Sequence, residues 1–542
     1  MQVKRTRCCH KKNRYLIIDD FDQMRVSFKG MLSSVGARDI VTQGNGEAAI
    51  RSLASEKFDV VICDYNLGEG RDGQQVLEEA RHLGFLGHAS TFFMITAVSN
   101  MPMVLGALEY QPDEYMIKPV NREVLLHRLA GTLKRKRQLT VIDEALAQGD
   151  KLRAIELCVE QRGSDLKRSL YLAKLQGELC IDLSRYEQAQ RVYETLLRIR
   201  NFPWAQFGLG KIALLRGELA EARRIFEALI EQNHHYVEVY DWLVKVLEAE
   251  GDFARAQSLL MQVTHLSPKS VVRQCALGRL ALRNDDLAVA EHAYQAAVRW
   301  GKHSCHASAD EYRQLATLYR DSGQTARMLR LLADGRKRFS HQPGDMIQLL
   351  CSQALFKRQL DGNSDIDSTL REVERMLEAH KHELLEDHLL NTASECYQLS
   401  RVEMAESILR IVLCNHHDDG EWIERVRQLM QAHDRQLNAE QLIRSVKGEL
   451  EEIHCRCNEL LSQGGLEKAV KLLNDTIDLY PGNRTLVLFS VATMIDFMRE
   501  HGVEQSYHFR CRHSLANLLE RDQLDRDANC YLEQLTQLLV QP

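Results

Sequence analysis

The sequence predicts a multidomain protein in which an α/β domain with a doubly wound parallel sheet precedes a long all-α domain. Two patterns predict this. Over roughly the first 130 residues, short apolar runs alternate with amphipathic helical stretches, which is typical of a parallel sheet covered by helices. Beyond this region the chain is predicted to be helical and repeats itself about every 34 residues. The length of 542 residues exceeds a single hydrophobic core and allows about two to four domains.

The α/β region contains five apolar runs that predict five strands. These runs lie at 15–19, 39–42, 58–64, 91–96 and 114–118. Helical patterns fill the intervals at 23–35, 46–57, 73–83 and 101–110, and a last one begins near Val120. Strands joined by helices run parallel, so their C-terminal ends are expected to meet at one edge of the sheet, where such folds bind ligands.

Polar side chains follow four of these strands. Asp19 and Asp20 end the first strand, Asp64 the third, Thr96 the fourth and Lys118 the fifth. Three carboxylates brought together repel one another unless a cation lies among them. Oxygen ligands that stay open to water suit Mg²⁺, which keeps several waters and takes further ligands from a substrate. The sequence therefore predicts a magnesium site at this edge.

A carboxylate beside Mg²⁺ can attack phosphorus and form an aspartyl-phosphate. Such a transfer depends mostly on positioning and charge neutralisation. Lys118 can pair with one phosphoryl oxygen, and the Thr96 hydroxyl can donate a hydrogen bond to another. Asp64, directly after the apolar run "DVVIC", is the expected phosphoryl acceptor.

With these residues at this spacing, residues 14–132 resemble the receiver domain of two-component response regulators, a CheY-like domain with a flavodoxin-like fold. Asp20 precedes Asp64 by 44 residues, Thr96 follows Asp64 by 32, and Lys118-Pro119 begins 22 residues later. The resemblance implies that a histidine kinase or a phosphotransfer protein phosphorylates Asp64.

The resemblance also implies roles for further residues. Besides Asp19, Asp20 and Asp64, the backbone carbonyl of Asn66 would bind Mg²⁺. Thr96 and Tyr115 occupy the family's switch positions, although Tyr115 also fits a core aromatic, and the two roles can coexist.

One residue departs from the family pattern, since Gly68 stands where the family usually has proline. Glycine loosens this loop and removes no ligand, so it bears on metal affinity and phosphoryl lifetime. Each site residue alone also fits an ordinary role, such as a strand-end acid or hydroxyl. Only their combination indicates the site.

The helical region repeats a pattern in which an alanine is followed four residues later by a large apolar residue. The pairs are Ala189–Tyr193, Ala222–Phe226, Ala256–Leu260 and Ala290–Tyr294, with alanines 33, 34 and 34 residues apart. Twelve residues before each alanine stand Gly177, Gly210, Val244 and Gly278. The alanine lets two helices approach closely, and the large residue fills the groove beside the next helix.

This pattern resembles the tetratricopeptide repeat, which implies stacked helix hairpins over 151–542 after a helical linker at 133–150. We expect about nine to eleven units in a superhelix. Weaker copies occur around Ala154, Met328, Ala405 and Ala469, with room for one degenerate unit in each of the two gaps after Met328. The stretch 361–367 is predicted to be a lengthened loop. The concave groove of such an array binds a protein or peptide partner, although the pattern does not select the lining residues.

Composition restricts the partners and the compartment. The net charge of −6 does not favour nucleic acid, and no apolar stretch approaches the ~18–20 residues that cross a membrane. Residues 1–13 are basic and are expected to be a solvated lead-in rather than a nucleic-acid arm. Fourteen cysteines without paired spacing fit a reducing cytoplasm.

The helical half shows no nucleophile–base constellation and no phosphate-binding loop, so no enzyme is expected beyond the receiver's own phosphorylation and dephosphorylation. Histidines and carboxylates at 380–383 and 415–422 lack the spacing of a metal motif.

Two functions remain open, with a third less favoured. In the first, phosphorylation of Asp64 changes what the repeats bind, as in a response regulator. In the second, the chain is a constitutive scaffold whose receiver serves only for docking. The third, a transcriptional regulator, lacks a helix-turn-helix with a basic recognition helix.

Overall fold

A computed structural model describes most of the chain, and its residues form two compact units, Met1–Ala307 and Ser308–Pro542. The described residues are 13–97, 104, 106, 109–136, 139–147, 149–163, 166–360, 366–380, 384–521 and 526–538. The predicted basic lead-in at 1–13 therefore lies outside them except for Asn13. Most of the predicted helix at 101–110 and of the predicted loop at 361–367 lies outside them as well.

The first unit begins with a five-stranded parallel sheet in the order β2-β1-β3-β4-β5. The strands are β1 (Arg14–Ile18), β2 (Asp39–Gln43), β3 (Val60–Asp64), β4 (Thr91–Thr96) and β5 (Glu114–Ile117). The predicted doubly wound sheet is confirmed, with strand ends within two residues of those expected. The strand order reverses between β1 and β3, which is where open α/β sheets bind ligands.

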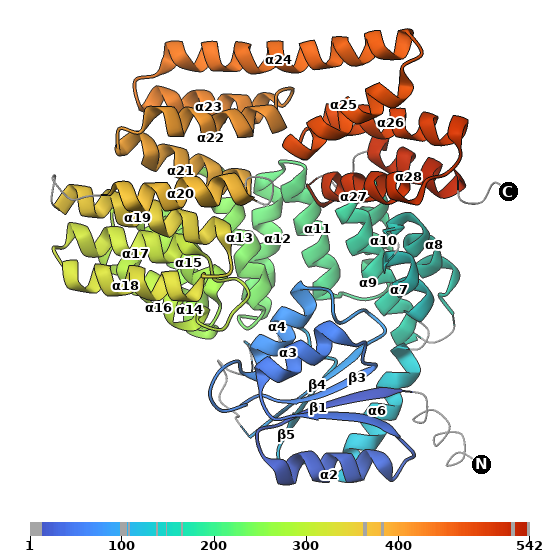
Figure 1. The fold of residues 1–542 in the computed structure, drawn as a ribbon. Coiled ribbons are helices and arrows are strands. Elements are labelled where there is room, and N and C mark those ends of the chain that lie inside the picture. The colour runs from blue at the N-terminus through green and yellow to red at the C-terminus, as the bar shows by residue number, and fades with distance from the viewer. Residues whose placement is uncertain are drawn as a thin grey trace. The chain divides into compact units, whose positions relative to one another are not determined.

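Helices cover both faces of the sheet (Figure 1). They are α2 (Asp22–Ser33), α3 (Gly46–Ser55), α4 (Gly73–His82) and α6 (Arg122–Lys136). Successive strand side chains point to opposite faces. Leu16 and Ile18 of β1 therefore pack in a core with α3 and α4, whereas Tyr15 and Ile17 pack in a second core with α2 and α6.

The rest of the first unit is all helical. Its helices are α7 (Thr140–Ala147), α8 (Lys151–Glu160), α9 (Leu166–Asp182), α10 (Tyr186–Ile199), α11 (Pro203–Leu215), α12 (Leu219–Gln232), α13 (Val237–Glu250), α14 (Phe253–Leu266), α15 (Val271–Arg283) and α16 (Leu287–Gly301). Ile142 and Ala145 of α7, which fall in the stretch expected to be a linker, are buried in one core with Ala154 and Ile155 of α8.

The alanine positions of the repeat are closely packed. All four predicted alanines are fully buried, and the four large residues that follow them are at most 2% exposed. A Cβ atom on Gly177 would lie 2.4 Å from the Tyr193 ring, and one on Gly210 would lie 2.4 Å from the Phe226 ring. The unit that has Val244 instead carries the smaller Leu260 at the facing position. Glycine therefore provides the space that an aromatic ring occupies.

A shared turn joins the two helices of each hairpin. Five residues before each alanine position, or before Met328, stands a residue with positive φ, a left-handed conformation that ends a helix and reverses the chain. These residues are Gly149, Ser184, Gly217, Gly251, Asp285, Gly323, Ser400, Asp434 and Gly464.

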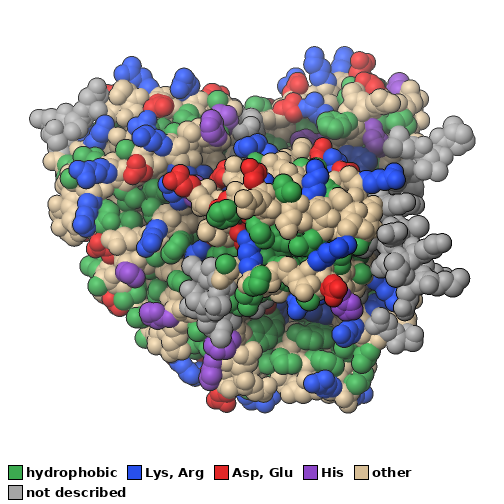
Figure 2. All heavy atoms as spheres, turned by 90° about the horizontal axis from the view of Figure 1, so that it is seen from below, with side chains coloured by type: hydrophobic (Ala, Val, Ile, Leu, Met, Phe, Trp, Pro, Cys, Tyr) green, Lys and Arg blue, Asp and Glu red, His purple; other side chains and the backbone are tan. Residues whose placement is uncertain are grey.

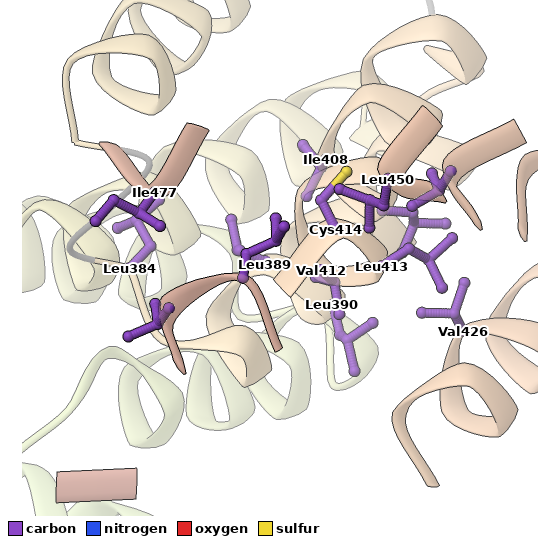
Figure 3. Close-up of a cluster of buried hydrophobic side chains, with 14 of the residues drawn as sticks. Leu384, Leu389, Leu390, Ile408, Val412, Leu413, Cys414, Val426, Leu450 and Ile477 are labelled. Atoms are coloured by element: carbon purple, nitrogen blue, oxygen red, sulfur yellow. The ribbon is translucent and has the colours of Figure 1, made fainter. Parts of the chain in front are cut away.

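The second unit is also all helical. Its helices are α17 (Ala309–Asp321), α18 (Thr325–Arg338), α19 (Pro343–Leu360), α20 (Asp367–His380), α21 (Glu386–Gln398), α22 (Val402–Asn415), α23 (Gly420–Ala432), α24 (Gln436–Ser462), α25 (Leu466–Leu479), α26 (Arg484–His501), α27 (Gln505–Arg521) and α28 (Arg526–Leu538). One hydrophobic core runs through most of them, and Figure 3 shows part of it, from Leu384 just before α21 to Ile477 of α25.

The sequence pattern left room for one degenerate repeat between Ala405 and Ala469 but did not identify its alanine. Ala439 follows Ala405 by 34 residues, is fully buried, and has Ile443 four residues later. Ala439 lies in the first turn of α24, whose 27 residues continue without a turn into the next repeat unit. The missing turn hides the periodicity, because the second helix of one hairpin and the first helix of the next are one helix.

Among the described residues, no helix combines the length and the apolar character needed to cross a bilayer.

Candidate functional site

The structure brings the acidic and basic side chains at the strand ends together. The Lys118 Nζ atom lies 2.8 Å from Asp64 Oδ2 and 3.0 Å from Asp19 Oδ2. Asp19 and Asp64 are 1% and 6% exposed. Because β1, β3 and β5 are parallel, three positions distant in the chain reach the same edge. Lys118 precedes Pro119 across a cis peptide bond.

The carboxylates fit a divalent cation. Oxygen atoms of Asp19, Asp20 and Asp64 all lie within 4.8 Å of one another. Asp20 Oδ1 is buried and makes no hydrogen bond to the described residues. A buried oxygen without a donor, beside two further carboxylates and one ammonium, is a suitable ligand for a hard cation such as Mg²⁺.

The charges at this edge perturb one another. Burial raises the pKa of Asp64. The hydrogen bond and the positive charge of Lys118 oppose this rise, whereas the nearby negative charge of Asp19 adds to it. Burial disfavours the charged form of Lys118, but its hydrogen bonds to Asp64 and Asp19 outweigh this and raise its pKa. Lys118 therefore stays charged and offsets part of the negative charge.

The remaining predicted site residues lie on or just after β3, β4 and β5. Thr96 ends β4 and is 1% exposed, and the side chain of Tyr115 on β5 lies beside it. Tyr115 also packs against the core of the sheet, so it is both a core aromatic and a neighbour of Thr96. Asn66 lies exposed in the loop two residues after Asp64.

The loop from Asp64 to α4 depends on its glycines. Gly68 has φ of +76°, which proline cannot adopt, so the loop takes a path different from one with proline there. A Cβ atom on Gly73 would lie 2.1 Å from the Asp64 carbonyl oxygen. The start of α4 is thus pressed directly against the backbone of Asp64.

The same loop contacts the helical repeats within the first unit. Lys269, between α14 and α15, lies 2.7 Å from Asp72 Oδ2 and 3.2 Å from the Tyr65 hydroxyl. The other carboxylate oxygen of Asp72 caps α4 by accepting the Gln75 backbone N–H at 2.9 Å. Tyr65 directly follows Asp64, so Lys269 contacts the residue next to the expected acceptor.

A second pair joins the segment after β4 to the same repeat. Arg273, at the start of α15, lies 2.6 Å from Glu109 and holds Asp241 of α13 with two hydrogen bonds. Glu109 lies between Thr96 and β5. The receiver segments that follow Asp64 and Thr96 therefore contact repeat positions only four residues apart. The sequence carried no signal for these pairs, because each joins surface residues of two different folds.

Helices α14, α15 and α16 line a pocket of about 600 Å³. Leu277 and Trp300 give it apolar walls, and His292 and Arg299 supply polar groups. The receiver touches its rim, because Gln75 Nε2 donates to the Trp300 carbonyl oxygen at 3.3 Å. Lys269 of the repeats, which Asp72 contacts, lies 5.4 Å from the Trp300 ring centroid.

On the face of the molecule in Figure 2, basic and acidic side chains lie scattered among hydrophobic and polar ones. A nucleic-acid surface would concentrate positive charge, which this face does not do.

Comparisons with known proteins agree with this geometry. The family model "Response regulator receiver domain" matches residues 15–130, and the model "Tetratricopeptide repeat" matches residues 175–234. Chemotaxis protein CheY of Pseudomonas aeruginosa is 28% identical over 122 residues, which are 22% of this chain and 97% of that protein. Chemotaxis protein CheY-3 of Vibrio cholerae is 29% identical over 126 residues, 23% of this chain and 95% of that protein.

A further relative is the transcriptional regulatory protein AfsQ1 of Streptomyces coelicolor, 28% identical over 185 residues, 34% of this chain and 77% of that protein. Among solved structures, a CheY-like receiver domain protein from Methanospirillum hungatei is 24% identical, with a TM-score of 0.22, and the match covers 23% of this chain and 97% of that one. The family models, together with the sheet order and the hairpins, confirm both resemblances: the chain carries a response regulator receiver domain followed by tetratricopeptide repeats.

Proposed function

We propose that this protein is a response regulator of a two-component phosphorelay, in which phosphorylation of Asp64 alters what the repeat domain binds. The observation that carries this proposal is the convergence of Asp19, Asp64 and Lys118 within 3.0 Å contacts at the strand ends. We place the phosphate-accepting domain at 14–132 and the repeats at 151–542. The histidine kinase or phosphotransfer protein that supplies the phosphoryl group remains a proposed partner.

In the proposed reaction, a carboxylate oxygen of Asp64 attacks the phosphorus of a partner's phosphohistidine. The new O–P bond forms as the N–P bond breaks, and the imidazole leaves with the electron pair. Lys118, which already contacts Asp64, would hold one phosphoryl oxygen, and Thr96 would donate to another. Such positioned charges supply most of the catalysis in phosphoryl transfer.

Asp19, Asp20, Asp64 and the backbone carbonyl of Asn66 would hold Mg²⁺. When bound, the ion offsets negative charge on the carboxylates and the phosphoryl oxygens. The unpaired Asp20 oxygen and the spacing of the three carboxylates support this ligand set.

The two ion pairs between receiver and repeats supply a route for the signal. A phosphoryl group adds about −1.5 to −2 charges beside Tyr65 and Thr96. The segments that follow these residues carry Asp72 and Glu109, which contact Lys269 and Arg273. Movement of either segment would therefore displace the start of α15 and the wall of the pocket formed by α14–α16, where we place the protein or peptide partner.

We propose a regulatory rather than an enzymatic role, in keeping with the receiver and tetratricopeptide-repeat family models that match the chain. We keep the cytoplasm as the proposed compartment, because a phosphorelay requires the chain to meet a kinase domain there. The competing function is a constitutive scaffold, in which the same contacts would hold the receiver in place regardless of phosphorylation.

Intact-mass measurement tests the acceptor. The full chain with acetyl phosphate and Mg²⁺ should gain about 80 Da, one phosphoryl group. Asp64→Asn should abolish the gain, whereas Asp22→Asn, an exposed acid at the start of α2, should retain it. No adduct on the unaltered chain, or an adduct that persists in Asp64→Asn, contradicts the proposal.

Partner capture with and without beryllofluoride, a phosphoryl mimic, separates the switch from the scaffold, since only a switch changes its captured proteins.

A further inference from the structure

A second cluster of metal-binding side chains lies away from the carboxylates of the phosphorylation site. It consists of Glu78 on α4 together with Cys305 and His306, which follow α16. One ligand atom from each residue lies within 4.8 Å of the other two. Glu78 is 6% exposed, and the other two side chains are half-buried. The pattern of the sequence could not reveal this cluster, because Glu78 and Cys305 are 227 residues apart.

The distances in the cluster are close to those of a coordination site. His306 Nε2 lies 3.4 Å from Glu78 Oε1. In a tetrahedral zinc site with bonds of about 2.0–2.3 Å, ligand atoms lie about 3.3–3.8 Å apart. The other ligand pairs lie within 4.8 Å, so a contraction of at most about 1.5 Å converts the cluster into such a site. His82, one turn after Glu78 on α4, has its ring centroid 5.0 Å from that of His306, so the two rings contact edge to face beside the cluster.

The surroundings act differently on the three side chains, since burial raises the pKa of Glu78 to about 7 and that of the Cys305 thiol to about 12. Glu78 accepts a hydrogen bond from the Tyr110 hydroxyl at 2.7 Å and another from Ser304, both neutral donors. Burial, together with His82, lowers the pKa of His306. A buried carboxylate among neutral donors lacks the full positive charge that a metal ion would supply.

The ligand types select the metal. A thiolate, an imidazole and a carboxylate suit zinc, whereas Mg²⁺ and Ca²⁺ prefer sites made only of oxygen. We propose that Glu78, Cys305 and His306 form a zinc site that joins α4 of the receiver to the repeats. Three protein ligands leave a fourth position for water. Binding releases the Cys305 thiol proton to solvent, since the thiolate is the ligand.

The proposed zinc site would restrain α4, the helix that follows the loop after Asp64. Lys269 holds the start of α4 through Asp72, and the metal would hold its second half through Glu78. Zinc would then oppose any displacement of α4 relative to the repeats. This inference does not depend on phosphorylation of Asp64, and zinc binding can be measured without it.

Zinc titration of the metal-free full chain by calorimetry tests the site, with excess Mg²⁺ present to occupy the carboxylates of the phosphorylation site. We expect one zinc ion per chain, bound with micromolar or tighter affinity, and binding weakened about tenfold or more in Cys305→Ser and in His306→Ala. The matched controls are Cys275→Ser and His303→Ala, which remove the same side-chain types from positions outside the cluster. Absence of tight binding, or equal affinity in all four variants, overturns the proposal.

Two further measurements keep the test independent of misfolding. Cobalt substitution should produce a thiolate-to-metal charge-transfer band that is absent in Cys305→Ser and present in Glu78→Gln, which keeps the shape of the side chain and the thiol. Zinc should also slow backbone hydrogen exchange in 73–82 and in 302–307 of the unaltered chain. Exchange that does not change in 73–82 would show that any bound metal does not reach α4, and would overturn the proposed bridge.

Discussion

The receiver sheet and the helical repeats of the same unit differ in the chain distance of the contacts on which they depend. Lys118 pairs with residues 99 and 54 positions away. In the repeats, Gly210 faces Phe226 only 16 positions away, and one unit earlier Gly177 faces Tyr193 in the same way. The receiver site therefore needs the whole domain to be folded, whereas each hairpin needs mainly itself and its neighbours.

This comparison predicts that a single charge change disables the receiver site, whereas a packing change in one hairpin stays local. Substitution of a residue at the strand ends should change the phosphorylation rate by orders of magnitude. A packing substitution in the repeats should change the free energy of unfolding by about a few kcal/mol.

The largest effect is expected for Lys118→Met, which removes the ammonium shared by Asp19 and Asp64. The phosphorylation rate with acetyl phosphate should fall about 100-fold or more, as on removal of other groups that stabilise transition-state charge. A time course of intact mass measures it. Lys29→Met, at an exposed position of α2, is the control, and circular dichroism checks that both variants fold. A rate within about threefold of the unaltered chain would break the comparison, because the site would then not depend on its long-range ion pair.

The repeats are tested by Gly210→Ala, which places a Cβ atom 2.4 Å from the Phe226 ring. Overpacking of this kind should lower the free energy of unfolding by about 1–3 kcal/mol in urea denaturation. Adding Phe226→Leu should recover part of the loss, because Val244 and Leu260 already show this combination at the same repeat positions. Gly131→Ala in α6, with open space around its Cβ position, should not destabilise. A phosphorylation rate altered more than about twofold by Gly210→Ala would show that the disturbance is not local.

The pH dependence of the second unit offers a smaller effect. Burial raises the pKa of Glu311 to about 7, even though Ser308 donates to it in a capping box. A carboxyl with a folded pKa above its unfolded value near 4.5 stabilises the protein when protonated, so its contribution is lost as pH rises from about 4.5 to about 7. Glu311→Gln keeps the capping box. From about pH 5 to about pH 8, its free energy of unfolding should rise by about 1–3 kcal/mol relative to that of the unaltered chain. Urea denaturation at both pH values measures this difference. The same comparison for Glu218→Gln, an exposed residue before α12, should show no change.

The smallest effect on the phosphorylation rate is expected for Lys269→Ala. The same substitution should have the clearest effect on the transmission of the signal from the receiver to the repeats. The phosphorylation rate should stay within about twofold, because Lys269 contacts Tyr65 and Asp72 but none of the three carboxylates. The change in hydrogen exchange at 261–300 caused by beryllofluoride should disappear. Lys245→Ala, which removes only a surface contact with Trp242, should preserve the change. Equal responses in both variants would mean that the signal does not pass through Lys269.

Much of the fold could be predicted because its signals are local. The five strands and the alternation of helices follow from apolar runs, and the repeats follow from the spacing of alanines such as Ala222 and Ala256. The prediction missed Ala439, because α24 runs through the place where a turn would mark the period. The site residues could be named from their positions at strand ends, since parallel strands align those ends automatically.

The sequence alone determined which residues belong to strands, which stand at the strand ends, and which form the repeating helix pairs, since these depend on neighbours within a few positions. Only the tertiary structure decided that Lys269 contacts Asp72, that Arg273 contacts Glu109, and that Glu78 meets Cys305 and His306. The physical reason is that these groups lie on the surfaces of separately patterned folds. No periodicity links their positions in the chain, and only the packing of one fold against the other brings these groups within bonding distance.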